Sequence, residues 1–279
     1  MSPLAADRRA RFGATVLATV VLLAVAAPLV TSVPPEATRD VVATRFLHPL
    51  STDLHGVFHL LGTDRLGRDV WARLLYGARL SLTVGALAIL ISSLLGLGIG
   101  AIAGSSRGLV RTSLLGITDF ALALPRVVLL LLLATLWQPG AVLVVLVLGF
   151  TGWMSVARLV FGEARGVMSR PFVESAAALG SGRLRVLVRH VLPNVLTPAL
   201  VAAALGFGNA IMLEAGLSFL GMGVQPPASS WGTMIASGRD TMVNAPWVAL
   251  APGVALVLVV VASTLLGDAL QEAWDPKRP

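Results

Sequence analysis

Six long apolar runs constrain what this chain can fold into more than any other feature of its sequence. A helix needs about 20 apolar residues to cross a hydrocarbon core of roughly 30 Å, and each run comes close to that length. Chain length alone would allow one or two soluble domains, but the runs favour a single bundle of spanning helices. We therefore predict an all-α membrane protein with about six transmembrane helices, at 12–33, 80–104, 113–137, 141–157, 195–221 and 247–267.

The composition also favours a fold in lipid. Hydrophobic residues make up 56% of the 279 residues and charged residues only 13%, far more apolar surface than a water-soluble core requires. Cysteine is absent, so neither a disulfide framework nor a thiolate metal site is available. The net charge of +7 comes largely from arginines at the ends of the apolar runs, so we expect no nucleic-acid partner.

The same arginines orient the predicted helices, because cytoplasmic loops near a membrane carry an excess of Lys and Arg. Arg8, Arg9 and Arg11 precede the first run, and the polar stretch 158–194 is rich in arginine. We therefore place the N-terminus, this stretch and the C-terminus in the cytoplasm. A cleavable signal ending near Ala24-Val25-Ala26 is the alternative for the first run. The predicted parts are a cytoplasmic N-terminus (1–11), a first transmembrane helix (12–33), an external segment (34–79), a five-helix core (80–268) containing the cytoplasmic loop 158–194, and a cytoplasmic tail (269–279).

The external segment is predicted to contain an amphipathic helix that starts at Thr63-Asp64, a plausible helix cap. Helical spacing would place Val70, Trp71, Leu74 and Leu75 on one face, and Asp69 would be in position to pair with Arg73. Two arrangements fit this pattern: the helix docks onto the bundle, or it lies among the lipid headgroups.

The loop 158–194 carries the most informative pattern. A short run of small residues ends at a helix-breaking glycine, and the group His190 to Asn194 follows after a basic segment. Leu184, Leu187, Val188 and Val191 are expected to form an apolar stripe, with Arg185 on another face. So long a loop favours a docking surface for a partner, and an interfacial helix on anionic lipid is the alternative. The candidate residues are Glu174, Ser175, Ala176, Ala177, Gly180, His190, Leu192, Pro193 and Asn194.

At these residues the chain resembles a known family, the inner-membrane permease subunits of ATP-binding-cassette (ABC) importers for dipeptides, oligopeptides and nickel. The family motif reads Glu-Ala-Ala, with glycine at its seventh place and Leu-Pro at its nineteenth and twentieth places. Ser175 replaces the middle alanine and His190 the usual isoleucine. The residues that match the motif are Glu174, Ala176, Gly180, Leu192 and Pro193, and further stretches similar to the peptide branch are 61–69, 217–223 with Pro226-Pro227 and Trp231-Gly232, and Gly267-Asp268 with Asp275-Pro276.

This resemblance implies a type I ABC importer permease architecture in a bacterial inner membrane. It implies a sister permease, two ABC ATPase subunits docked on the cytoplasmic loops, and an extracytoplasmic binding protein that delivers a peptide or a related solute. The helix at 174–180 would couple ATPase closure to movement of the spans. The chain itself would bind no cofactor, because ATP and Mg²⁺ would be held by the partner subunits.

The sequence offers no catalytic site of its own. A phosphate-binding GxxxxGK[ST] loop requires a lysine, and the only lysine is Lys277, with no glycine pattern before it. His55 and His59 have a spacing that could bind a metal on a helix, but Gly56 weakens a helix there and further ligands are not evident. We therefore expect no enzyme activity and no metal site, with these histidines in a solvated loop.

Three charged residues fall within the predicted spans: Asp119, Arg126 and Glu214. A charge at that depth costs roughly 2.5–3.5 kcal/mol on insertion scales, so each should face a partner or a wet cavity. Arg126 could line the pathway and attract a substrate carboxylate, or form a structural ion pair with Asp119 or Glu214. An ion-coupled secondary transporter that uses these charges is the main alternative function, and a scaffold or channel without energy input is a third. Asn209 and its neighbouring glycines are interpreted as helix-packing residues.

Overall fold

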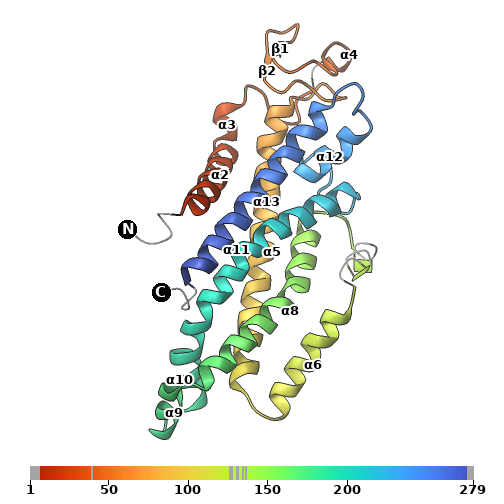
Figure 1. Ribbon diagram of the computed structural model, residues 1–279. Helices are drawn as coiled ribbons and strands as arrows, with labels where there is room; N and C mark the ends of the chain where they lie inside the picture. The colour runs from red at the N-terminus through yellow and green to blue at the C-terminus, as the bar shows by residue number, and fades with distance from the viewer. Residues whose placement is uncertain are drawn as a thin grey trace.

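The computed structural model describes residues 7–38, 40–125, 128, 129, 132, 133, 135 and 137–274. In this part of the chain, four helical stretches are long and apolar enough to cross a membrane. They are α5 (Val70–Ser105), α8 (Ala141–Met168), the continuous stretch Arg183–Phe219 and α13 (Trp247–Trp274). Figure 1 shows them packed side by side as an elongated bundle, so the all-α membrane fold is confirmed. These four helical stretches contain four of the six predicted spans; the predicted spans at 12–33 and 113–137 are not among the candidates within the described residues.

The remaining elements complete the bundle and its two ends. Residues 183–219 comprise α10 (Arg183–Val186), the π-helix η1 (Leu187–Val191) and α11 (Leu192–Phe219). At one end, called here the hairpin end, lie α3, α4, β1 and β2, and at the other, called here the loop end, lie α9 and α10 (Figure 1). The other helices and strands are α2 (Arg8–Val25), α3 (Ala27–Val30), α4 (Val41–Thr44), β1 (Ser51–Thr52), β2 (Phe58–His59), α6 (Leu109–Ala123), α9 (Pro171–Ala178) and α12 (Trp231–Arg239).

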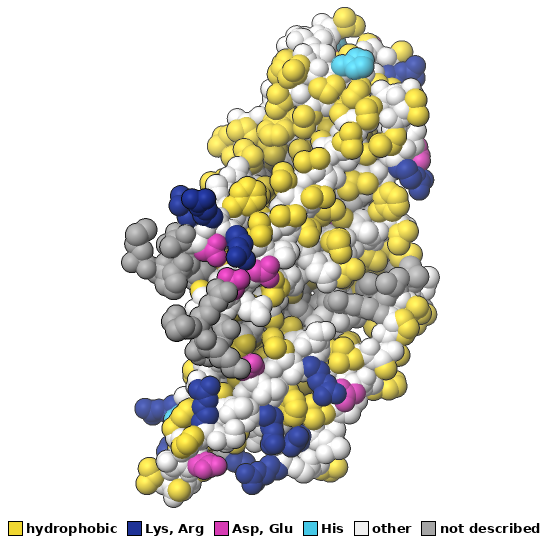
Figure 2. Space-filling model, in the orientation of Figure 1, with side chains coloured by type: hydrophobic (Ala, Val, Ile, Leu, Met, Phe, Trp, Pro, Cys, Tyr) yellow, Lys and Arg dark blue, Asp and Glu magenta, His cyan; other side chains and the backbone are white. Residues whose placement is uncertain are grey.

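The first and last helices are antiparallel neighbours. Arg9 near the start of α2 forms an ion pair with Glu272 near the end of α13, with 3.3 Å between Nη1 and Oε1. Helix α13 starts at the hairpin end and runs away from it (Figure 1). The start of α2 and the end of α13 therefore both lie away from the hairpin end. Figure 2 shows hydrophobic side chains across the body of the molecule and basic side chains gathered at the loop end, as the positive-inside rule predicts.

Helix α5 corrects the prediction of a separate amphipathic helix. It begins at Val70, where the Asp69 carboxylate accepts a hydrogen bond from the Ala72 N–H (2.6 Å), and not at Thr63-Asp64. It then continues without a break through the span predicted at 80–104, for 36 residues or about 54 Å. Val70 and Leu75 are buried, so this first part is docked onto the bundle and does not lie among headgroups.

Helices α5 and α8 meet along a seam of glycines. Gly96, Gly100 and Gly104 recur at every fourth position of α5 and all face α8. A Cβ atom at Gly100 would lie 2.5 Å from the Ala157 carbonyl oxygen and 2.8 Å from the Val160 Cβ atom. Small residues at this spacing let two helix backbones approach closely, which favours helix association in lipid.

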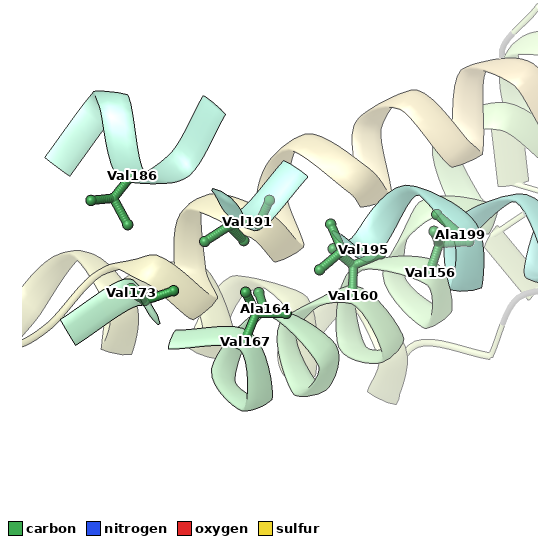
Figure 3. Close-up of a cluster of buried hydrophobic side chains, with 10 residues drawn as sticks. Val156, Val160, Ala164, Val167, Val173, Val186, Val191, Val195 and Ala199 are labelled. Atoms are coloured by element: carbon green, nitrogen blue, oxygen red, sulfur yellow. The ribbon is translucent and has the colours of Figure 1, made fainter. Parts of the chain in front are cut away.

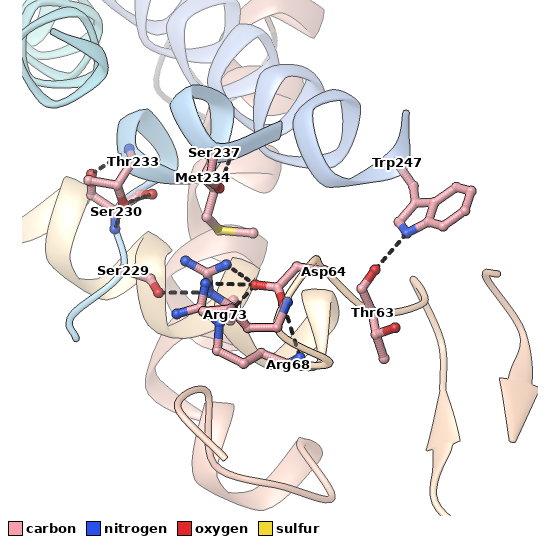
Figure 4. A network of polar contacts seen from close by, with 11 residues as sticks. Thr63, Asp64, Arg68, Arg73, Ser229, Ser230, Thr233, Met234, Ser237 and Trp247 are labelled. Carbon is pink, nitrogen blue, oxygen red and sulfur yellow. Dashed lines mark hydrogen bonds and ion pairs between the residues drawn. The ribbon is translucent and has the colours of Figure 1, made fainter. Parts of the chain in front are cut away.

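A buried ion-pair network holds the hairpin end together (Figure 4). The Asp64 carboxylate accepts hydrogen bonds from the Arg73 Nη1 group (2.5 Å) and the Arg68 Nε group (2.8 Å). The Arg73 Nε group also donates to the Ser229 hydroxyl (3.0 Å), which lies just before α12. Arg73 therefore pairs with Asp64, and the prediction that it pairs with Asp69 is wrong, because Asp69 caps α5 and bonds to His59 instead.

Two tryptophans link the segment that contains Asp64 and Arg73 to the segment around α12 and the start of α13. The indole N–H of Trp247 donates to the Thr63 carbonyl oxygen (3.2 Å; Figure 4), and that of Trp231 donates to the Leu74 carbonyl oxygen (3.1 Å). Segments far apart in the sequence, around 61–74 and 229–247, thus form one structure at the hairpin end. Their polar residues are engaged with one another, which is a structural role.

Candidate functional site

Helix α9 lies at the tip of the loop end, beyond the last turn of α8 (Figure 1). It begins with Pro171 in its first turn, where a missing N–H costs no helical hydrogen bond. Helix α8 continues to Met168, so Arg158 lies within a helix, and the predicted boundary of the loop at Arg158 is wrong. The segment between the spanning helices is accordingly shorter and more helical than the sequence indicated.

Gly180 ends α9 for a backbone reason. Its φ angle is +85°, in the left-handed region that L side chains rarely adopt. The Gly180 N–H donates to the Ala177 carbonyl and the Ser181 N–H to the Ala176 carbonyl, both at 3.0 Å, which is the Schellman arrangement. No neighbouring atom lies within 4 Å of a Cβ built at Gly180, so within this chain the glycine serves the turn and not a close approach.

The outer face of α9 is exposed. Glu174 lies in the first turn, where its negative charge is favoured by the helix dipole, and Ser175 and Ala177 are exposed beside it. Leu179 is 88% exposed and Leu184 73% exposed, although both are large apolar side chains. This short helix with small residues and flanking leucines has the character of a surface that another protein covers.

The inner face of α9 is anchored to the spanning helices (Figure 3). Val173 is 2% exposed and belongs to one hydrophobic cluster with residues from α8, α10, η1 and α11. Figure 3 shows these side chains following one another from the tip of the loop end into the bundle. The labelled members are Val156, Val160, Ala164, Val167, Val173, Val186, Val191, Val195 and Ala199. Helix α9 is therefore part of the same packed core as the ends of α8 and α11 at the loop end.

The second part of the motif lies where η1 joins α11. Pro193 cannot donate a backbone hydrogen bond, and the π-helix directly precedes it, with the Leu192 N–H donating to the Leu187 carbonyl. The Asn194 side-chain amide donates to the His190 carbonyl oxygen (2.7 Å). The His190 ring contacts Phe172 of α9, with ring centroids 5.9 Å apart. The two halves of the motif, 19 positions apart in the sequence, are thus brought together.

The predicted apolar stripe of this loop is divided between two faces. Val191 is buried, but Leu184 and Val188 are 73% and 54% exposed. The cause is the π-helix, which has a wider turn than the α-helix on which the predicted spacing depended. The buried positions that sequence reasoning missed are Val173 and Val186, which the Glu-Ala-Ala motif does not mark.

The predicted intramembrane charges have separate surroundings. Asp119 of α6 forms an ion pair with Arg158 of α8, and both side chains are partly exposed. Glu214 is 0% exposed, and its carboxylate accepts hydrogen bonds from the hydroxyls of Ser81 (2.8 Å) and Ser218 (2.7 Å). Arg126 lies outside the residues that the structure describes. Glu214 thus joins α5 to α11, a placement that favours a structural role for it.

The histidines of the external segment do not share a helix. His55 lies in the turn between β1 and β2, whereas His59 lies in β2, is 3% exposed and bonds through Nδ1 to the Asp69 carboxylate (2.7 Å). The helical metal pair considered from their spacing is therefore wrong, and so is the expectation that both are solvated. Among the described residues, no group of three or more His, Cys, Asp or Glu is placed to hold a metal ion.

Asp53 gives the β1–β2 hairpin a dependence on pH. Burial raises the pKa of its carboxyl, but hydrogen bonds from the Val57 and His55 N–H groups and the nearby His59 ring outweigh burial and lower the pKa. Because the folded pKa is lowered, ionised Asp53 stabilises the hairpin above the unfolded pKa of about 3.9, and this stabilisation is lost as the pH falls through the folded pKa. We expect Asp53→Asn to speed hydrogen exchange of the Leu50 amide, which bonds to His59, at pH 7. The difference from the parent protein should vanish at low pH, and a difference that persists there would contradict the assignment.

Comparison with known proteins now identifies the family. The family model described as "Binding-protein-dependent transport system inner membrane component" matches residues 96–278. A peptide transport system permease protein of Brucella suis is 39% identical over 270 residues, 97% of this chain and 88% of the relative. The di/tripeptide transport system permease protein DppC of Pseudomonas aeruginosa is 40% identical over 218 residues, 78% of this chain and 72% of the relative.

A solved structure agrees with the fold. The MetNI methionine ABC transporter, in inward-facing conformations, matches with a TM-score of 0.59 over 72% of this chain and 96% of that chain, at 19% identity. The family consists of transport permeases and not of catalytic enzymes, and its members work with ATPase and substrate-binding partners. With this fold, the exposed α9 and the match over 96–278, the chain belongs to the family of binding-protein-dependent transport system inner membrane components.

Proposed function

We propose that this protein is a permease subunit of an ABC importer in a bacterial inner membrane and forms part of the translocation pathway for di- or oligopeptides. The observation that carries the proposal is the two-sided placement of α9. Its outer face is exposed, and its inner face reaches the spanning helices through Val173 and the cluster around it. The names of the relatives from Brucella suis and Pseudomonas aeruginosa support a peptide as the solute.

In this proposal α9 is the mechanical link to an ATPase. A partner ATPase that holds ATP and Mg²⁺ would bind the surface around Glu174 and Leu179, and nucleotide-driven closure of the ATPase subunits would displace α9. Since Val173 of α9 belongs to the same hydrophobic cluster as Val167 of α8 and Val195 of α11, the displacement would tilt both helices. This chain would bind no cofactor. Two ATPase subunits, a sister permease and an external binding protein would complete the transporter.

An ion-coupled secondary transporter remains the alternative that the experiment must distinguish. It would need an intramembrane charge that can exchange ions with water. Glu214 is fully buried between two serine hydroxyls, and Asp119 is engaged with Arg158, so neither placement favours ion coupling. The exposed α9 would have no function in such a transporter.

The test is ATP-dependent uptake of a labelled dipeptide into vesicles that contain the assembled complex. We expect Glu174→Lys and Gly180→Arg to reduce uptake at least tenfold, because one reverses a charge on the exposed face and the other disrupts the turn at φ +85°. Gly166→Arg is the control, since Gly166 is exposed on α8, has open space around it and lies outside the α9 surface. It should assemble and transport normally.

Assembly must be measured in the same membranes. Loss of uptake counts only if the variants still form the complex, and the expected defect is in ATPase coupling. Uptake that continues without any ATPase, or that follows a proton or sodium gradient, would overturn the importer proposal in favour of the secondary transporter.

A further inference from the structure

Two cavities lie along the same face of the bundle, between α8 and α11. The cavity farther from the loop end, called here the upper cavity, has a volume of about 360 Å³ and is also lined by Ala88, Ile89 and Ser92 of α5. The cavity nearer the loop end, called here the lower cavity, has a volume of about 490 Å³ and is also lined by Gln271 and Trp274 of α13. Both volumes fall in the range of sites that hold small molecules.

The two cavities are adjacent. Leu159 of α8 and Ala202 and Leu205 of α11 line both of them. We call the two adjacent cavities together the α8–α11 groove. It follows α11 from Leu213 in the upper cavity down to Asn194, close to the loop end, in the lower one. Leu213 and Asn194 are 19 residues apart on α11, about 28 Å of helix, which is close to the full thickness of the hydrocarbon core of a bilayer.

The upper cavity is lined by polar side chains whose transfer into hydrocarbon would cost free energy. Ser155 of α8 and Asn209 of α11 are exposed there, in helices that are otherwise apolar. Neither side chain makes a hydrogen bond to any residue in the described part of the chain. An amide left without partners in hydrocarbon costs several kcal/mol, so Asn209 must meet water, solute or another polar group. Within the described part of this chain Asn209 is exposed, whereas Gly208 beside it packs against Val260 and Ser263.

A negatively charged side chain lines the lower cavity. Glu163 of α8 is exposed and lines this cavity with Asn194, Thr197 and Gln271. No cation within the described ranges pairs with its carboxylate. Glu163 falls in the stretch 158–194 that the positive-inside rule places in the cytoplasm, so water reaches the lower cavity from the loop end.

We propose that the α8–α11 groove is this chain's wall of the transport path, wetted by water, and that Asn209 and Ser155 contact the backbone amides of the passing peptide. This inference rests on the proposed function and deepens it. Among the described lining residues of the upper cavity none is charged, so amide and hydroxyl groups handle the solute where solvation is poorest. Glu163 then attracts the ammonium group of the peptide toward the loop end.

The absence of cysteine from the sequence makes a direct test possible. We would introduce single cysteines as Asn209→Cys, Ser155→Cys and Glu163→Cys and measure their rates of labelling, in the assembled complex, by a charged water-soluble thiol reagent. The matched control is Met212→Cys, because Met212 is 51% exposed on the same helix but lines neither cavity. A thiol reacts through its thiolate, which forms in water and not in lipid.

We expect the groove cysteines to be labelled at least tenfold faster than Met212→Cys, and a dipeptide substrate to slow the labelling at Asn209→Cys. A second readout is uptake: Asn209→Leu should raise KM several-fold, whereas Met212→Leu should leave KM unchanged. If Asn209→Cys is labelled as slowly as Met212→Cys, the groove is dry, filled by lipid or by the sister permease, and the inference fails. That result would leave ATP-dependent uptake and its loss in Gly180→Arg unaffected, so the two proposals fail separately.

Discussion

Gly100→Val is expected to abolish assembly of the transporter in the membrane. The new Cβ atom would lie 2.5 Å from the Ala157 carbonyl oxygen, and a backbone atom cannot move aside as a flexible side chain can. Helices α5 and α8 would have to separate along the seam, and the close packing that holds them together in lipid would be lost. Overpacking usually costs about 1–3 kcal/mol, and a clash against backbone lies at the upper end of that range or beyond it. The measurement is the fraction of the chain recovered in the intact complex after mild detergent extraction.

The helix supplies its own control two residues away. A Cβ at Gly98 would have no neighbouring atom within 4 Å, so Gly98→Val adds the same side chain to the same helix without a clash. It should assemble and support uptake like the parent protein. Equal behaviour of the two variants would show that the glycine seam does not determine how α5 and α8 pack.

Asp64→Ala is expected to cause the largest loss of stability at the hairpin end. Asp64 is 1% exposed, and its removal leaves the guanidinium of Arg73, itself 4% exposed, without its carboxylate. Breaking a buried pair in this way costs about 3–5 kcal/mol because an uncompensated charge stays buried. The Arg68 and Leu66 N–H groups would also lose their acceptor. We would measure the midpoint of thermal unfolding of the purified complex and the protease sensitivity of residues 50–69.

An exposed ion pair gives the comparison. Asp240 and Arg239 are paired at 3.0 Å with both side chains more than 60% exposed, and such pairs contribute about 0–1 kcal/mol. Asp240→Ala should therefore leave the unfolding midpoint nearly unchanged. If Asp64→Ala also left it unchanged, the network would not stabilise the hairpin end, and the stretch 61–69 would need another explanation, such as contact with the binding protein.

Part of the candidate site could be predicted from the sequence because local chemistry determines it. Gly180 follows a run of helix formers at the place where the helix must end, and only glycine adopts its φ of +85° at no cost. The exposure of Glu174 and Ser175 also followed from the motif. The anchoring face could not be predicted, because Val173 becomes buried only when α8 and η1 are in place, and the π-helix changes the spacing on which a helical stripe depends.

The hairpin end shows the same limit. Asp69 lies four residues before Arg73, so helical spacing predicted their pairing. In the fold Asp69 lies at the cap of α5, where the Ala72 N–H bonds to one carboxylate oxygen and His59 to the other, and Arg73 bonds to Asp64 instead. Sequence spacing describes neighbours on one helix, whereas these partners come from a loop and a hairpin.

The sequence by itself determined that the chain is a membrane-spanning bundle with a basic loop that ends a short helix at a glycine, because hydropathy, charge placement and the preference of glycine for left-handed turns are properties of single segments. Only the tertiary structure decided which faces of those segments are exposed and which are packed. Asn209 and Gly208 are adjacent on α11, yet one is exposed in the α8–α11 groove and the other is packed against α13. The physical reason is that the free energy of a polar group in a membrane depends on what its neighbouring helices leave open to water, and that arrangement exists only after the helices have packed.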